Sequence, residues 1–218
     1  MQLYNPKGIK PSMVISEEDL SWARNILFDN FTQNWCNANP SSIYSVGGYF
    51  PPDDSKLHEK IAVLNFLKLK EIKPISILDI GTGAGHFIKL ANSLGHNSAG
   101  TEIAESINVL DDVYKHYQLA VSELEIQKQK EIQLNSTFDI ISSLRTTFNE
   151  GDLGELYYTK QDWIFLKDNI FNFLNVGGKF FIKTNLKLHS GIPQHEIFQA
   201  FGEPLNGWNS FTYCLEKT

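Results

Sequence analysis

Apolar residues recur with a helical period through the first 70 residues of the chain. Their spacing at intervals of three and four residues predicts one helix over about residues 16–35 and a second over 56–69. Ser16, followed by three acidic residues, is typical of a helix start. The stretch 39–55 between the two helices is dense in Pro, Gly, Ser and Asn and predicts an aromatic-rich loop.

Beyond Pro74 the pattern changes to short, continuous apolar runs, which are typical of strands buried in a parallel sheet. Strands are predicted, in chain order, over residues 75–80, 97–103, 122–127, 138–144, 179–185 and 210–216. Helices are predicted over residues 86–95 and 104–117, from Thr159 to the glycine pair at 177–178, and over 193–201.

This alternation predicts an α/β fold, a doubly wound, Rossmann-like and mostly parallel sheet with helices on both faces. An N-terminal helical extension precedes the sheet. We therefore expect an extension or lid over residues 1–70 and the main domain over 71–218.

The segment "DIGTGAG" places three glycines at alternate positions directly after the first predicted strand. A turn is expected to need one glycine, so Gly81, Gly83 and Gly85 together indicate a ligand that lies against the backbone. The dinucleotide pattern G-x-G-x-x-G would require glycine at the position of His86, and no GK[ST] sequence follows. The spacing therefore favours a ligand that is not held by phosphates, and a nucleotide-dependent oxidoreductase is the second choice among enzymes.

Two acidic residues accompany this loop. Asp79 precedes the turn, where its carboxylate could accept a hydrogen bond from an ammonium group or hold the loop. Glu102 ends the second predicted strand, and a carboxylate at that place can accept hydrogen bonds from both hydroxyls of a ribose. Two such hydrogen bonds to Glu102 would distinguish a nucleoside from most other metabolites.

The pattern D-x-G-x-G-x-G, with an acid ending the second strand, resembles class I S-adenosylmethionine-dependent methyltransferases over about residues 74–185. "FDIISS" and "GGKFFI" are similar to the fourth and fifth strands of that fold. The run "FDIISSLRTTFN" resembles a bacterial subgroup of uncertain substrate, associated with sugar or surface-polysaccharide modification. The family usually adds a helix, a sixth strand and an antiparallel seventh after the fifth strand, so the short remainder here indicates a sheet one strand short.

The resemblance implies S-adenosyl-L-methionine as the cofactor. The glycines would then back its methionine and ribose portions, Asp79 would lie under the methionine end, and Glu102 would bind the ribose hydroxyls. The adenine would lie near Ile103 and the residues after the third strand. The expected cofactor-binding residues are Asp79, Gly81, Thr82, Gly83, Gly85, Glu102 and Ile103.

Methyl transfer from a sulfonium is an in-line displacement that mainly requires alignment, and a base is needed only if the acceptor must lose a proton. No [ND]PP[YFW] sequence follows the fourth strand, which argues against methylation of nucleobase or glutamine amines. Arg145 follows that strand and either holds an anionic substrate or lies on a surface loop. His189 and His195 are candidate bases or surface residues.

The catalytic residues are otherwise unassigned. Tyr44, Tyr49 and Asn149 are further acceptor-side candidates. Tyr44, Tyr49 and Phe50 either form a lid over the cofactor or pack against the N-terminal helices. His86 is expected at a helix start without a catalytic role, and Trp163 is expected in the core.

Composition narrows the function classes. The chain has 218 residues, a net charge of −6 and no basic run, which does not favour a nucleic-acid partner. Its two cysteines are far apart and no Cys/His cluster occurs, so no metal site is expected. No signal-peptide pattern and no membrane-spanning apolar run is present, which predicts a cytoplasmic protein without a membrane partner.

The leading hypothesis is a methyltransferase acting on a small-molecule substrate, with a sugar or surface-glycan precursor as a narrower option. A non-catalytic module that keeps the methyltransferase fold is the alternative from a different class. A homodimer is left open.

Overall fold

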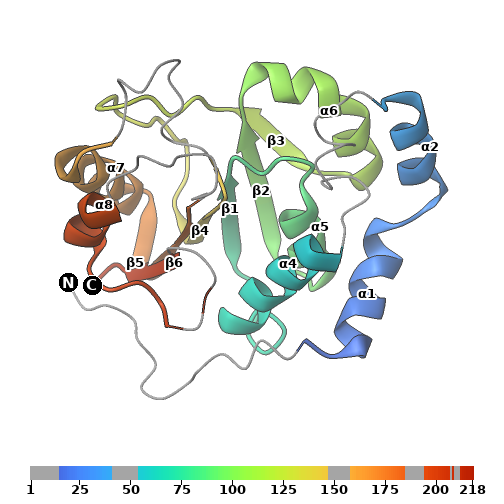
Figure 1. Ribbon diagram of the computed structural model, residues 1–218, viewed down its shortest axis with the longest axis horizontal. Coiled ribbons are helices and arrows are strands. Elements are labelled where there is room, and N and C mark those ends of the chain that lie inside the picture. The colour runs from blue at the N-terminus through green and yellow to red at the C-terminus, as the bar shows by residue number, and fades with distance from the viewer. Residues whose placement is uncertain (1–14, 41–53, 147–157, 185–193, 207, 209–211) are drawn as a thin grey trace. The chain divides into compact units, whose positions relative to one another are not determined.

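The computed structural model of the protein describes residues 15–40, 54–146, 158–184, 194–206, 208 and 212–218 (Figure 1). The chain divides into two compact units. The first unit contains residues 76–81 and 124–218, and the second contains residues 11–75 and 82–123. The boundary expected at residue 70 between an extension and a main domain stays a prediction.

The described residues of the first unit form four strands and two helices. Its elements are β1 (Ser76–Ile80), β4 (Phe138–Leu144), α7 (Lys160–Asn172), β5 (Leu174–Lys183), α8 (Gln194–Phe201) and β6 (Thr212–Glu216). β1 pairs with β4 and β4 with β5 in parallel, whereas β6 runs antiparallel to β5. Phe201 of α8 contacts the rings of Trp163 on α7, Phe180 on β5 and Tyr213 on β6. Helices α7 and α8 therefore share a core with these two strands. Trp163 is 1% exposed, which confirms it as a core residue.

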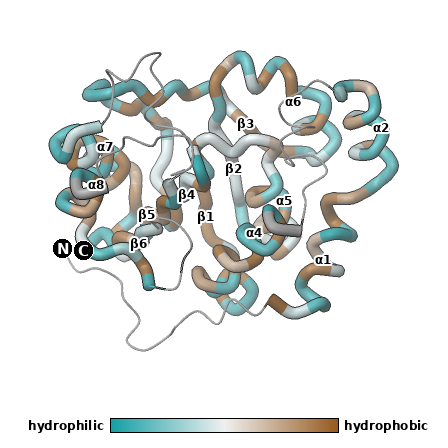
Figure 2. Tube along the Cα trace, in the orientation of Figure 1, coloured by the Kyte–Doolittle hydropathy of each residue, from teal (hydrophilic) through white to brown (hydrophobic). Residues whose placement is uncertain are grey.

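The second unit combines the N-terminal helices with a parallel strand pair. Its elements are α1 (Glu17–Leu27), α2 (Asn30–Ala38), α4 (Asp54–Phe66), α5 (His86–Ser93), β2 (Asn97–Glu102), α6 (Ala104–Tyr117) and β3 (Ala120–Glu123). β2 and β3 are parallel and pair from Ala99 with Ala120 to Glu102 with Glu123. Figure 2 shows hydrophobic and hydrophilic positions alternating along α1 and α6, and the buried residues of both helices recur at intervals of three and four.

The strands hydrogen-bond in the order β3-β2-β1-β4-β5-β6. This order, with β6 antiparallel, confirms the predicted Rossmann-like, mostly parallel sheet. In the described part of the chain the strands number six, and the antiparallel strand pairs directly with β5. No helix among the described residues combines the length and the apolar composition needed to cross a membrane.

Three element predictions are wrong in detail. The single helix expected over 16–35 is two helices, because Phe28 leaves the helical conformation and Asp29 starts α2 with a capping box. The third strand lies at Ala120–Glu123 instead of 122–127. The glycine pair 177–178 lies inside β5 and does not end α7, which stops at Asn172.

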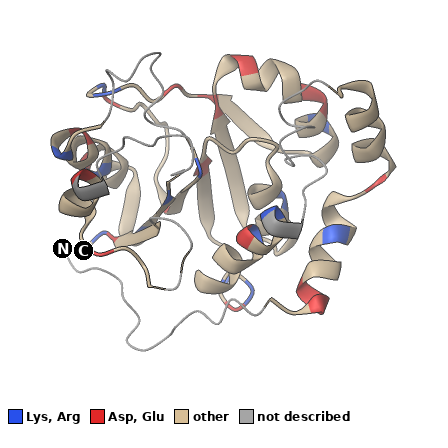
Figure 3. Ribbon diagram, in the orientation of Figure 1, with Lys and Arg blue, Asp and Glu red and all other residues tan. Residues whose placement is uncertain are grey.

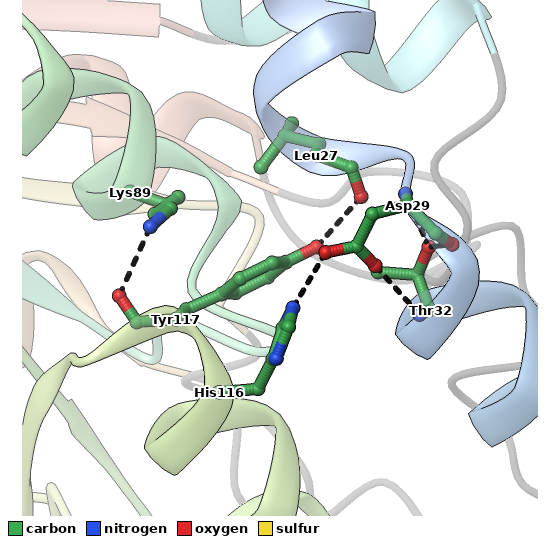
Figure 4. Close-up of polar contacts among 6 residues, drawn as sticks. All are labelled: Leu27, Asp29, Thr32, Lys89, His116 and Tyr117. Atoms are coloured by element: carbon green, nitrogen blue, oxygen red, sulfur yellow. Dashed lines mark hydrogen bonds and ion pairs between the residues drawn. The ribbon is translucent and has the colours of Figure 1, made fainter.

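Hydrogen bonds connect the N-terminal helices α1 and α2 to the end of α6 (Figure 4). Asp29 Oδ1 accepts a hydrogen bond from Thr32 N at 2.9 Å, and its Oδ2 lies 2.6 Å from His116 Nε2. The buried Tyr117 donates its hydroxyl hydrogen to Leu27 O at 2.8 Å. These contacts fix the ends of α1 and α6 and the start of α2 against one another.

Asp29→Ala is expected to lower stability by about 1 kcal/mol at neutral pH, because the helix loses its N-cap acceptor. Burial raises the pKa of Asp29, but the hydrogen bonds from Thr32 and His116 outweigh it and hold the pKa below its ordinary value. The unfolded chain therefore takes up the proton first as pH falls, and the contribution is lost on acidification. Urea unfolding at pH 7 and pH 3 should show a smaller difference between mutant and parent at pH 3, because the contribution is lost only below the ordinary carboxyl pKa. An equal difference at both pH values would contradict this.

The connection from β3 to β4 contains neither helix nor strand among residues 124–137. It is attached to α7 by side chains. Asp162, whose side chain is fully buried, accepts hydrogen bonds from Thr159 and Gln129 and lies 3.0 Å from Lys128 Nζ. Asp162 therefore connects this segment to the start of α7.

Candidate functional site

The glycine loop directly follows β1 and leads into α5. Gly81, Gly83 and Gly85 have φ angles of +67°, +56° and +76°, a region that residues with a side chain rarely adopt. A Cβ at Gly81 would lie 2.3 Å from Thr146 Oγ1, and one at Gly85 would lie 2.3 Å from Leu119 Cδ1. The expectation that a turn needs only one glycine here is therefore wrong, because all three positions have a backbone conformation that favours glycine.

Replacement of Gly81 by alanine is expected to cost more stability than replacement of Gly177. Both glycines have positive φ, +67° and +75°, so the backbone strain is matched at about 1–2 kcal/mol. Nothing lies within 4 Å of a Cβ at Gly177, whereas Thr146 obstructs one at Gly81, which adds about 1–3 kcal/mol. Urea denaturation of the two variants measures the difference. Equal losses would mean that the loop can move away from Thr146.

Glu102 ends β2 and holds the middle of the glycine loop. Its Oε2 accepts a hydrogen bond from Gly83 N at 2.8 Å, and its Oε1 accepts one from Ile103 N at 3.1 Å. A carboxylate oxygen has two acceptor sites, so each oxygen keeps one for a further donor. Ile103, 41% exposed, presents an apolar surface next to this carboxylate. The arrangement can therefore bind a pair of hydroxyls beside an apolar ring.

Tyr114 also anchors the loop and was not predicted from the sequence. Its hydroxyl donates to Gly83 O at 2.6 Å from the middle of α6. The buried positions of that helix are Leu110, Val113, Tyr114 and Tyr117. Their helical spacing indicates that the Tyr114 side chain faces the core. The sequence does not show which backbone group its hydroxyl binds.

Thr82 contributes a buried hydroxyl to the loop. It is 9% exposed, its N donates to Thr101 O at 3.0 Å, and its Oγ1 has no hydrogen-bond partner among the described residues. A buried hydroxyl without a partner costs about 1–3 kcal/mol. A ligand with polar groups would remove this cost.

Asp79 lies within the first unit at the end of β1. It is 1% exposed, and its Oδ1 accepts a hydrogen bond from Ser142 Oγ at 2.7 Å. Asp79 and Ser142 are also opposite each other in the pairing of β1 with β4. The buried carboxylate is thus fixed immediately before the glycine loop.

The segment after β4 is fixed on the beginning of the same loop. Thr146 Oγ1 donates to Ile80 O at 2.7 Å and accepts a hydrogen bond from Ser143 Oγ at 2.8 Å. Arg145 has a φ of +67°, and its N donates to Lys183 O at 2.7 Å. Arg145 therefore lies where β4 and β5 end.

The other acceptor-side candidates receive less support. Burial, with a smaller contribution from the charge of Lys60, lowers the pKa of His86 to about 3, so this imidazole is neutral at physiological pH. Its ring packs edge-on against Tyr117, with the centroids 6.4 Å apart. Five of the remaining candidates lie outside the described residues: Tyr44, Tyr49, Phe50, Asn149 and His189. His195 lies in α8, and its side chain is outside the described part of the structure. No group of three or more His, Cys, Asp or Glu that could hold a metal ion occurs in the described part of the chain.

Comparison with known proteins identifies the fold. No protein-family model matches the chain, and no curated protein sequence matches it. Among solved structures, the Thermus thermophilus 16S rRNA N2 G1207 methyltransferase RsmC, in complex with AdoMet and guanosine, is 20% identical with a TM-score of 0.52. The match covers 76% of this chain and 43% of that one.

Two further structures are similar at lower scores. TrmN from Thermus thermophilus is 16% identical with a TM-score of 0.49, over 73% of this chain and 49% of that one. SAM-bound CalS10, an amino pentose methyltransferase from Micromonospora echinaspora, is 19% identical with a TM-score of 0.43, over 73% and 58%. The chain spans about half the length of these proteins. At such identities the likeness shows the fold alone, which is that of class I S-adenosylmethionine-dependent methyltransferases.

Proposed function

We propose that the protein is an S-adenosylmethionine-dependent methyltransferase that acts on a small-molecule acceptor. The observation that carries the proposal is the carboxylate of Glu102. It ends β2 and anchors a loop of three positive-φ glycines, and each of its oxygens keeps an acceptor site. This is the chemistry that a ribose with two free hydroxyls requires.

The described residues fit the cofactor. Glu102 would bind the ribose hydroxyls, Ile103 would pack on the adenine, the Thr82 hydroxyl would gain a partner, and Asp79 would support the methionine end. The bound cofactor supplies a methyl group made electrophilic by the positive charge on sulfur. Because this leaving group needs no acid, the residues around it have only to hold and align the acceptor.

The charge pattern supports a small acceptor. The chain carries a net charge of −6, and Figure 3 shows Lys and Arg interspersed with Asp and Glu along its helices. Binding to nucleic acid usually needs a concentrated basic surface, so RNA is disfavoured even though RsmC is an rRNA methyltransferase. A sugar or surface-glycan precursor remains the narrower proposal, which rests on the sequence resemblance.

Thermal unfolding with S-adenosylmethionine, S-adenosylhomocysteine, NAD and NADP tests the cofactor. A ligand at 100 times its Kd adds about 2.7 kcal/mol, and each kcal/mol raises Tm by roughly 2–4 °C for a chain of this size. We expect a shift with the two adenosyl compounds only. A shift with NAD or with none of the four would contradict the proposal. Binding of S-adenosylmethionine without methylation of any pooled acceptor would favour the non-catalytic module.

A further inference from the structure

The second half of α6 contacts both the glycine loop and the N-terminal helices. Tyr114 and Tyr117 lie three positions apart and belong to the buried face of this helix. Residues at this spacing lie next to each other on one side of a helix. Their hydroxyls reach two segments that are distant in sequence, the glycine loop and the end of α1.

Gly83 is held by side chains at both of its backbone polar groups. Its N–H donates to Glu102 Oε2 at 2.8 Å, and its carbonyl accepts a hydrogen bond from the Tyr114 hydroxyl at 2.6 Å. Each peptide group is planar, so the two hydrogen bonds orient the peptide planes before and after Gly83. Glycine has the widest choice of backbone conformations, and Tyr114 therefore restricts the half of the residue that Glu102 does not hold.

Tyr117 connects the start of α5 to the end of α1 (Figure 4). Its hydroxyl donates to Leu27 O at 2.8 Å. Its ring packs edge-on against His86, the residue directly after Gly85, with the centroids 6.4 Å apart. Lys89 Nζ donates to Tyr117 O at 3.2 Å and lies 5.4 Å from the centroid of the same ring. Tyr117 therefore contacts α1 and also the helix into which the glycine loop leads.

The residue before Tyr117 holds the junction between α1 and α2. His116 Nε2 lies 2.6 Å from Asp29 Oδ2, and the His116 ring stacks on Phe31 with the centroids 4.1 Å apart. Tyr114, which holds the glycine loop, lies within one helical turn of both contacts. Docking of the N-terminal helices and fixing of the loop therefore use the same part of α6.

We propose that Tyr114 and Tyr117 are positioning residues for the cofactor. Tyr114 holds the glycine loop in its binding conformation, and Tyr117 makes this conformation depend on docking of the N-terminal helices. The assignment to the cofactor rests on the proposed methyltransferase function. A loop that is already ordered lowers the cost of ligand binding, and packed side chains and hydrogen bonds transmit such ordering between segments. The N-terminal helices thereby regulate the affinity of the cofactor site.

Hydrogen exchange of single backbone amides, measured by NMR on the free chain, tests the coupling without any ligand. Gly83 N and Gly85 N are the reporters, because both donate hydrogen bonds within or to the loop. Tyr114→Phe should speed their exchange roughly two- to tenfold, which corresponds to one lost hydrogen bond. Tyr117→Phe removes only the hydroxyl that reaches Leu27, and it should speed the same amides at least about twofold.

Controls separate this effect from a general loss of stability. Amides of β2 report general stability and should change less than the loop amides. Asp111→Ala, which breaks an exposed ion pair with Lys115 on the same helix, should leave exchange in the loop unchanged. His116→Gln alters a more exposed contact with the same junction, so it serves as a second variant if Tyr117→Phe does not fold.

Isothermal titration calorimetry with S-adenosylhomocysteine measures the effect on the site. Tyr114→Phe and Tyr117→Phe should each raise Kd roughly two- to tenfold, whereas Asp111→Ala should not. Coupling is reciprocal, so saturating S-adenosylhomocysteine should slow exchange of the Thr32 and Gln33 amides at the start of α2. A hydroxyl with a purely structural role would not produce this remote protection.

The outcomes separate this inference from the proposed function. Unchanged loop amides in folded Tyr117→Phe, or equal acceleration in β2 and in the loop, would overturn the coupling. Unchanged loop amides in folded Tyr114→Phe, or an unchanged Kd in both variants, would overturn the positioning roles. If the parent chain binds neither S-adenosylmethionine nor S-adenosylhomocysteine, the methyltransferase proposal fails, while exchange in the free chain still decides whether the helices and the loop are coupled.

Discussion

Glu102→Ala is expected to weaken S-adenosylmethionine binding by at least about a hundredfold. A hydrogen bond to a charged acceptor contributes about 1.5–3 kcal/mol, so loss of two ribose bonds corresponds to about two to four decades in Kd. The variant also removes the acceptor of Gly83 N, which lies 2.8 Å from Glu102 Oε2, so the loop becomes less well fixed. Isothermal titration calorimetry measures the affinity.

Two variants separate ribose binding from anchoring of the loop. Glu102→Gln keeps the length and one acceptor oxygen, so we expect a loss between those of the parent and Glu102→Ala. Glu123→Ala is the matched control, because Glu123 is the exposed residue opposite Glu102 in the pairing of β2 with β3. Its affinity should equal that of the parent. Parental affinity in folded Glu102→Ala would contradict the assignment to the ribose.

The sequence predicted the elements whose apolar pattern is strong. The run 138–144 matches β4 residue for residue, and the run 97–103 differs from β2 by one residue. Both strands are largely buried, so continuous apolar or small residues mark them. β3 was misplaced because it lies at the end of the strand order and its residues are mostly exposed, which leaves no apolar period to follow.

The break between α1 and α2 shows a second limit. Phe28 continues an apolar pattern, so periodicity alone favours one long helix over 16–35. The structure ends α1 before Phe28, and the capping box of Asp29 with Thr32 begins α2. A local hydrogen-bonding preference therefore overrides the period, and only a search for caps inside the predicted helix could have found it.

The sequence predicted only the part of the candidate site that a local motif marks. The glycine loop and Glu102 are adjacent in the structure, although the glycines are required by the backbone and by neighbours such as Thr146. Tyr114 was not predicted, since its role depends on a contact with a residue distant in sequence. Tyr114 lies 31 positions from its partner Gly83. Side chains that act through such tertiary contacts carry no local signature.

Asp162→Ala is expected to lower the free energy of unfolding by about 3 kcal/mol, which is typical when a buried ion pair loses one partner. Asp162 Oδ2 accepts hydrogen bonds from Thr159 N at 2.8 Å and Thr159 Oγ1 at 2.7 Å, and its Oδ1 accepts one from Gln129 Nε2 at 2.6 Å. Lys128 Nζ lies 3.0 Å from Oδ2. Alanine would leave these donors without their acceptor and remove the contacts of residues 128–129 with α7, while Ile132 N still donates to Asn169 Oδ1 at 3.3 Å.

Urea denaturation at pH 7 compares this variant with Asp168→Ala. Asp168 lies on the same helix, and its side chain is 64% exposed beside Lys167. Exposed ion pairs contribute little, so Asp168→Ala should change stability by less than about 0.5 kcal/mol. Losses of similar size in the two variants would show that the buried carboxylate does not attach the segment.

The pH dependence provides an independent check on Asp162. Burial raises the pKa of its carboxyl, but the hydrogen bonds from Thr159 and Gln129 and the contact with Lys128 outweigh burial and lower the pKa. The stabilisation is therefore complete above the ordinary carboxyl pKa and is lost as pH falls through the lowered value. Asp162→Asn keeps the volume but cannot titrate. Between pH 7 and pH 3 its stability should fall less than that of the parent, and a parallel fall in both would place the acid sensitivity at other carboxylates.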